Sequence, residues 1–83
     1  MNAAVEAKAA EIKTIVCRVL SVDPATVSDT DLFIEDLGAD SLKLVEVLAT
    51  LQIKLDVEVD PADFRRLVNL EGVYEVLSEA LAE

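Results

Sequence analysis

The chain has 83 residues, enough for one small domain with a modest hydrophobic core and too few for a deep catalytic cleft. Its 17 acidic and 7 basic residues give a formal net charge of -10. Such a surface repels nucleic-acid phosphates and anionic lipid headgroups and attracts basic proteins. We therefore expect a single monomeric domain over residues 1–83 that binds basic proteins and neither nucleic acid nor membranes.

The chain contains one cysteine, Cys17, so it forms no internal disulfide, and this composition is typical of a reducing compartment. The first 13 residues lack the apolar segment of a secretory signal. We therefore expect a cytoplasmic protein. Cys17 lies among apolar residues of a helical pattern, so a buried thiol is expected rather than a reactive one.

A first helix is predicted from about Asn2 to Leu20, where apolar residues recur every three or four positions until Asp23-Pro24 ends the pattern. The members of this apolar face are Val5, Ala9, Ile12, Val16 and Val19.

A long connection follows from Asp23 to Asp40, with six acidic residues and no basic one. Because a free loop of this length is unusual in so small a domain, we expect its apolar residues to hold it against the core. These residues are Val27, Leu32, Phe33, Ile34 and Leu37.

A second helix is predicted from Ser41 to about Leu55, and it carries two apolar stripes. The stripe expected to face the core consists of Leu44, Val47, Leu48, Leu51 and Leu55. The other stripe consists of Leu42, Val45, Ala49 and Ile53, beside Glu46. A helix that is apolar on nearly two faces is either sunk in the core or docks another molecule, and in so small a bundle docking has at least equal weight.

Two further helix starts are recognisable. Asp60-Pro61 predicts a short helix through Phe64 to about Leu67, because it combines an acidic cap with proline at the first helical position. Asn69 is expected to cap a last helix, whose apolar face is Leu70, Val73, Tyr74, Leu77, Ala80 and Leu81. Residues 53–59 alternate like a strand but have no second strand to pair with. The expected fold is an all-α four-helix bundle, with three longer helices, a short third one and a long ordered loop.

Ser41 stands where the long connection becomes the second helix, and its residue type suits either a plain helix cap or a site of chemistry. Catalysis by Ser41 is not expected, because the chain has no histidine to activate the hydroxyl and no glycine two positions away on either side. Lys43, among acids at the surface, keeps its proton. The acidic residues before Ser41 lack the spacing of a calcium loop, so we expect no metal site. We therefore expect a protein that is not an enzyme.

Modification of Ser41 by another protein is the remaining possibility. Gly38 can turn the chain, Ala39 is too small to obstruct access, and the free N–H groups of a helix start favour an added phosphate. A cap formed by Asp40 or Ser41 is compatible with such a modification.

Residues 36–42, with the sequence DLGADSL, precede Val45-Glu46 and a leucine-rich helix, and they closely resemble the 4′-phosphopantetheine attachment motif of acyl carrier proteins. The resemblance covers nearly the whole chain. It implies that Ser41, with Asp40 and Gly38 beside it, is the attachment site. In that family the serine hydroxyl attacks the pyrophosphate of coenzyme A, which is bound with magnesium on a separate holo-synthase. The covalent 4′-phosphopantetheine arm ends in a thiol that holds acyl groups as thioesters.

The resemblance also implies the partners: the holo-acyl-carrier-protein synthase, and acyl ligases, synthases or transferases with basic docking faces. The residues expected to meet them are Asp36, Leu42, Val45, Glu46, Ala49 and Ile53. Lys43, Lys54 and the pair Arg65-Arg66 make the surface less uniformly acidic than in the housekeeping fatty-acid carrier. These departures favour a specialised carrier. Ala39 in place of a second glycine favours acyl or polyketide cargo over that of the peptidyl carriers.

A non-catalytic acidic adaptor that binds a basic protein is the alternative. It explains the charge and the second stripe of the second helix, but it does not explain the run from Gly38 to Leu42 at a helix start.

Overall fold

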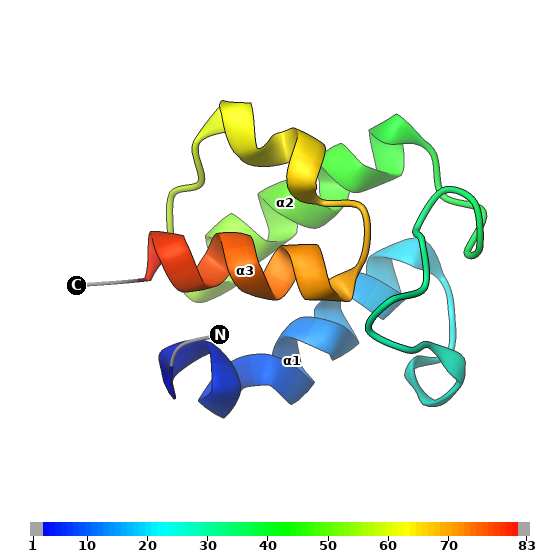
Figure 1. Ribbon diagram of the computed structural model, residues 1–83, viewed down its shortest axis with the longest axis horizontal. Helices are drawn as coiled ribbons and strands as arrows, with labels where there is room; N and C mark the ends of the chain where they lie inside the picture. Colours follow the sequence, from blue (N-terminus) through cyan, green and yellow to red (C-terminus); the bar gives the residue numbers. More distant parts are fainter. Residues whose placement is uncertain (1–2, 82–83) are drawn as a thin grey trace.

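Three α-helices and two short 3-10 helices make up the computed structural model, which describes residues 3–81. Their order is α1 (Ala3–Leu20), η1 (Pro24–Thr26), α2 (Ser41–Leu55), η2 (Pro61–Arg66) and α3 (Leu70–Ala80). No strand occurs within these residues. The long connection occupies one end of the bundle, and α2 begins there and runs toward the opposite end (Figure 1). The predicted all-α fold with three longer helices and a short one before the last is confirmed.

The differences from the predicted elements are small. The expected helix start at Asn2 lies outside the described residues. The segment after Asp23, which the sequence pattern marks only as the end of α1, forms the extra helix η1. The short helix η2 is a 3-10 helix that ends at Arg66, and Leu67 is its C-terminal cap.

Acidic or amide side chains start each of the four helices after α1. The side chains of Asp23, Asp40, Asp60 and Asn69 each accept a hydrogen bond from a backbone N–H two or three residues further on. A cap of this kind typically contributes about 0.5–2 kcal/mol to the stability of an α-helix. The caps of η2 and α3 confirm the predicted starts, and at α2 the capping residue is Asp40 and not Ser41.

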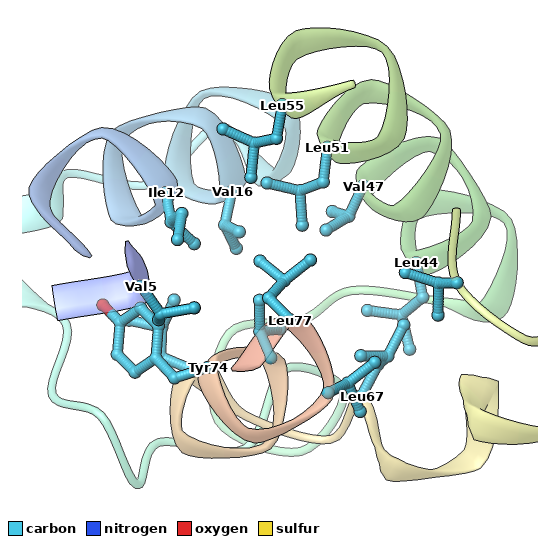
Figure 2. Close-up of a cluster of buried hydrophobic side chains, with 14 of the residues drawn as sticks. Val5, Ile12, Val16, Leu44, Val47, Leu51, Leu55, Leu67, Tyr74 and Leu77 are labelled. Carbon is cyan, nitrogen blue, oxygen red and sulfur yellow. The ribbon is translucent and has the colours of Figure 1, made fainter. Parts of the chain in front are cut away.

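The core is formed by apolar side chains from all three α-helices, which point toward a common interior (Figure 2). The helical residues buried there are Val5, Ile12, Val16 and Cys17 of α1, Leu44, Val47, Leu51 and Leu55 of α2, and Leu70, Val73, Tyr74, Val76 and Leu77 of α3. Burial raises the pKa of the Cys17 thiol, as expected for an unreactive cysteine. Leu48 lies at the margin of its stripe and is half-buried. Ala80, in the last turn of α3, is exposed, so the prediction is wrong for this member of the face, whereas the next residue, Leu81, is half-buried against the core.

The long connection is held against the bundle, as predicted. Phe33 is fully buried and Val27 nearly so. The backbone N–H of Phe33 donates to the carbonyl of Val68, and the N–H of Glu71 donates to the carbonyl of Asp29. These bonds join the connection to the start of α3. Ile34, which was expected to point inward, is 53% exposed, because its neighbour Phe33 takes the inward position.

A close backbone contact joins η2 to α3. A Cβ atom on Gly72 would lie 2.1 Å from the carbonyl oxygen of Arg66, so only glycine fits at this position. The Arg66 guanidinium also donates to Asp63 at 3.2 Å and to Glu79 at 2.8 Å. Its hydrogen bonds lower the pKa of Glu79. Backbone packing and charge together therefore fix η2 on α3.

Candidate functional site

Ser41 is the first residue of α2, and its side chain is exposed. Within residues 3–81 no group hydrogen-bonds to its hydroxyl, and the N–H groups of Ser41 and Leu42 have no acceptor. The side chain of Asp40 occupies the N–H of Lys43, at 2.9 Å. The hydroxyl is therefore available for reaction, because Asp40 carries out the capping.

The first turn of α2 is open to an added anion. It contains no acidic residue, whereas the first turns of α1 and α3 contain Glu6 and Glu71. The positive end of a helix dipole favours negative charge, and although the Asp40 carboxylate already occupies the N–H of Lys43 there, the N–H groups of Ser41 and Leu42 stay free. The arrangement fits a phosphodiester on the Ser41 oxygen.

The turn before Ser41 is set by Gly38 and Asp36. Gly38 has φ +73°, a left-handed conformation that favours glycine, and nothing lies within 4 Å of the place where a Cβ would be. The carboxylate of Asp36 accepts a hydrogen bond from the N–H of Leu32 at 2.8 Å. The N–H of Ala39 donates to the carbonyl of Phe33 at 2.9 Å. Asp36 was expected to contact partners, and its hydrogen bond within the long connection was not predicted.

The second apolar stripe of α2 lies on the surface. Leu42, Val45 and Ile53 are 68%, 51% and 80% exposed, and Ala49 is exposed between them. At 3.6 residues per turn the four positions fall within an arc of about 80°. Glu46 lies beside the stripe, where its carboxylate is 3.6 Å from the ammonium of Lys43. We call these five residues the docking face.

A small pocket beside Leu44 of α2 was not predicted. It has a volume of about 120 Å³ and is lined by Leu32, Ile34, Glu35, Leu44 and Val68. Two of these residues, Ile34 and Val68, are half-exposed. The pattern of the sequence gives no sign of the pocket, because it forms where the long connection meets the segment before α3.

Two negative findings limit the chemistry of the described residues. Between residues 3 and 81, no three histidine, cysteine or acidic side chains lie close enough together to hold a metal ion. None of the helices in this part of the chain is long and apolar enough to cross a membrane.

Comparison with known proteins identifies the family. Residues 10–77 match the family model described as "Phosphopantetheine attachment site". The chain is 50% identical over 74 residues to polyketide-8 synthase acyl carrier protein 1 of Streptomyces avermitilis, covering 89% of this chain and 88% of the relative. It is 44% identical over 63 residues to an acyl carrier protein of Campylobacter lari, covering 76% and 82% of the two chains.

A solved structure agrees with these matches. A chain in the structure titled "The ishigamide ketosynthase/chain length factor" has a TM-score of 0.72 and 32% sequence identity. The match covers 89% of this chain and 93% of that one. Members of the matched family carry covalent 4′-phosphopantetheine and act as carriers rather than catalysts. The chain belongs to the acyl carrier protein family, whose members hold acyl groups on a 4′-phosphopantetheine arm.

Proposed function

We propose that Ser41 is the attachment residue and that this chain carries acyl or polyketide intermediates as thioesters. The observation that carries the proposal is the exposed, unbonded hydroxyl of Ser41 at the start of α2, next to free N–H groups. Asp40 and Gly38 position it: Asp40 caps the helix, and Gly38 turns the chain before it. When attached, the group supplies the terminal thiol to which the acyl cargo is bound.

Polyketide biosynthesis is the pathway that the similarities favour. The 50% identity to a polyketide synthase carrier exceeds the 44% identity to the acyl carrier protein of Campylobacter lari. The neighbouring structure named after a ketosynthase supports the same choice. We therefore propose a specialised carrier that delivers its cargo to condensing enzymes and transferases. We also propose that the protein is a cytoplasmic monomer and has no catalytic activity of its own.

Partners are proposed to bind the docking face. Its apolar side chains give contact area next to Ser41, and the net charge of -10 attracts the basic surface of a synthase and raises the association rate. The Lys43–Glu46 ion pair partly neutralises the face, so its partners need fewer basic residues there.

Intact-mass measurement tests the attachment residue. The chain is incubated with a holo-acyl-carrier-protein synthase, coenzyme A and magnesium. We expect the mass to increase by one phosphopantetheine group, and fragmentation to place that group on the peptide containing Ser41. A modified peptide without Ser41 would refute the assignment, and an unmodified chain would favour the acidic adaptor.

Substitutions on the docking face are expected to slow modification without unfolding the protein. Leu42→Ala removes an apolar contact, and Glu46→Lys repels a basic partner. Because both positions are exposed, each change should alter stability by at most about 0.5–1 kcal/mol. We expect kcat/KM for the synthase to fall about three- to tenfold, measured beside thermal melts. Glu11→Lys, the same charge change at an exposed position of α1, is the control and should leave the rate within about twofold. Equal losses at Glu11 and Glu46 would show that only overall charge matters.

A further inference from the structure

A groove between α1 and α2 lies on a part of the surface that the proposed function does not use. It has a volume of about 370 Å³ and is lined by Ala10, Glu11, Thr14, Ile15 and Arg18 of α1 and by Lys54 of α2. Three of these residues, Ala10, Thr14 and Arg18, are spaced four positions apart and form one stripe along α1. We call this site the α1–α2 groove.

The two basic side chains of the α1–α2 groove are exposed and free. Neither the Arg18 guanidinium nor the Lys54 ammonium has an ion-pair or hydrogen-bond partner among residues 3–81. By contrast, the ammonium of Lys43, also in α2, lies 3.6 Å from the carboxylate of Glu46. In a chain with 17 acidic and only 7 basic residues, two positive charges at one site are therefore left without a counter-charge of their own.

The other side chains of the groove leave these two bases as its hydrogen-bond donors. The Thr14 hydroxyl donates to the carbonyl of Ala10 at 2.9 Å, so it is already used. Ile15 is half-buried against the core and provides an apolar wall. The single acid, Glu11, is seven residues before Arg18, about 10 Å further along α1. The groove therefore suits an anionic ligand that also carries an apolar group.

The α1–α2 groove is separate from the docking face and from the attachment residue. Around the axis of α2, Lys54 lies about 100° from Ile53, and the other members of the exposed apolar stripe lie further round. Along the axis, Lys54 is thirteen residues from Ser41, or about 20 Å. The remaining lining residues all belong to α1. A protein bound in the groove can therefore leave Ser41 accessible.

Charge decides which kind of partner fits the groove. Arg18 and Lys54 repel a basic segment and attract carboxylates. The net charge of -10 opposes the approach of an extended anionic surface such as nucleic acid or an anionic membrane. A short acidic segment brings only a few like charges, and its carboxylates can pair directly with the two bases at contact.

We propose that the α1–α2 groove binds a short acidic segment of a partner protein, with carboxylates on Arg18 and Lys54 and an apolar side chain against Ile15. The site goes beyond the proposed function, because it selects a partner by the opposite charge and does not depend on modification of Ser41. It allows the carrier to stay attached to one protein through this groove while an enzyme with a basic surface acts at Ser41.

The test uses NMR on the isotope-labelled chain with a synthetic peptide of three glutamates and one leucine. A second peptide has glutamine in place of each glutamate. We expect the amides of residues 10–18 and of Lys54 to shift with the acidic peptide only. Arg18→Gln and Lys54→Gln should each weaken binding about two- to fivefold, and the double variant about tenfold, because exposed ion pairs are individually weak.

Lys8→Gln is the matched control. It removes the same charge from an exposed position of α1 that does not line the groove, so it should bind the acidic peptide like the unaltered chain. Glu11→Gln tests the sign of the effect. It removes a negative charge from the groove and should strengthen binding up to about twofold.

Three results would overturn the proposal: no shifts at residues 10–18, equal losses in Lys8→Gln and Arg18→Gln, or equal binding of the two peptides. Sedimentation of the unliganded chain as a dimer that Arg18→Gln dissociates would also overturn it, by showing that the acidic surface of a second copy occupies the groove. Ser41→Ala should bind the acidic peptide normally, so this test and that of the attachment residue fail independently.

Discussion

Ser41→Ala is expected to abolish modification by the holo-synthase completely and to leave the fold unchanged. The variant lacks the oxygen that would form the phosphodiester, and intact mass would show no added group. The free energy of unfolding should change by no more than about 0.5 kcal/mol, because Asp40 and not Ser41 caps α2, and alanine is a good helix former. Thermal melts of both chains check this part.

Asp40→Ala is the matched control. It removes the hydrogen bond from the N–H of Lys43 to the Asp40 side chain and should cost about 1 kcal/mol. The Ser41 hydroxyl remains, so its folded fraction should still gain the phosphopantetheine mass. The two variants therefore separate the cap from the attachment residue. Modification of Ser41→Ala, or a loss of stability in it as large as that in Asp40→Ala, would contradict the assignment of these roles.

Local signals in the sequence were sufficient for much of the fold. Asp60 and Asn69 precede helical patterns, and both act as caps in the structure. The period of apolar residues correctly separated the buried stripe of α2 from the exposed one. Such features depend on neighbours three or four residues away, which is why a single sequence is enough to predict them.

Where two local choices are equally good, the sequence does not decide. Asp and Ser are both favourable caps, and the extended conformation of Asp40 makes it the one that caps α2. The apolar residues of the long connection indicated that it is ordered, but not that Phe33 would point inward and Ile34 outward. Ala80 follows the helical period, yet it is exposed, while its neighbour Leu81 packs against the core.

Features formed by segments far apart in the sequence could not be predicted. The pocket beside Leu44 needs the long connection to meet the residue Val68. Gly72 is a further case. Within a helix, sequence patterns treat glycine only as a residue that costs stability, about 1 kcal/mol relative to alanine.

Gly72→Ala is expected to destabilise the protein, although alanine is the better helix former. The new Cβ would lie 2.1 Å from the backbone oxygen of Arg66, so η2 or α3 must move to make room. Overpacking of a close contact typically costs 1–3 kcal/mol. Because backbone and not a flexible side chain is in the way, we expect a cost at the top of that range and, after the gain of about 1 kcal/mol in helix propensity, a net loss of about 2 kcal/mol, or about 8–16 °C in Tm. Urea unfolding and thermal melts measure both quantities.

Gly38→Ala provides the comparison, since the same methyl group is added where nothing lies within 4 Å. Its cost comes only from the left-handed φ of +73° and should be about 1–2 kcal/mol. The Arg66 ion pairs depend on the position of η2, which Gly72→Ala should displace and Gly38→Ala should not. We therefore expect Gly72→Ala to shift the NMR signals of η2 and α3. Gly38→Ala should shift only the signals near the turn before Ser41. A neutral or stabilising effect of Gly72→Ala would contradict this expectation. It would mean that the higher helix propensity of alanine stabilises α3 by more than the contact with the Arg66 oxygen costs, and that η2 can move away from α3 at little cost.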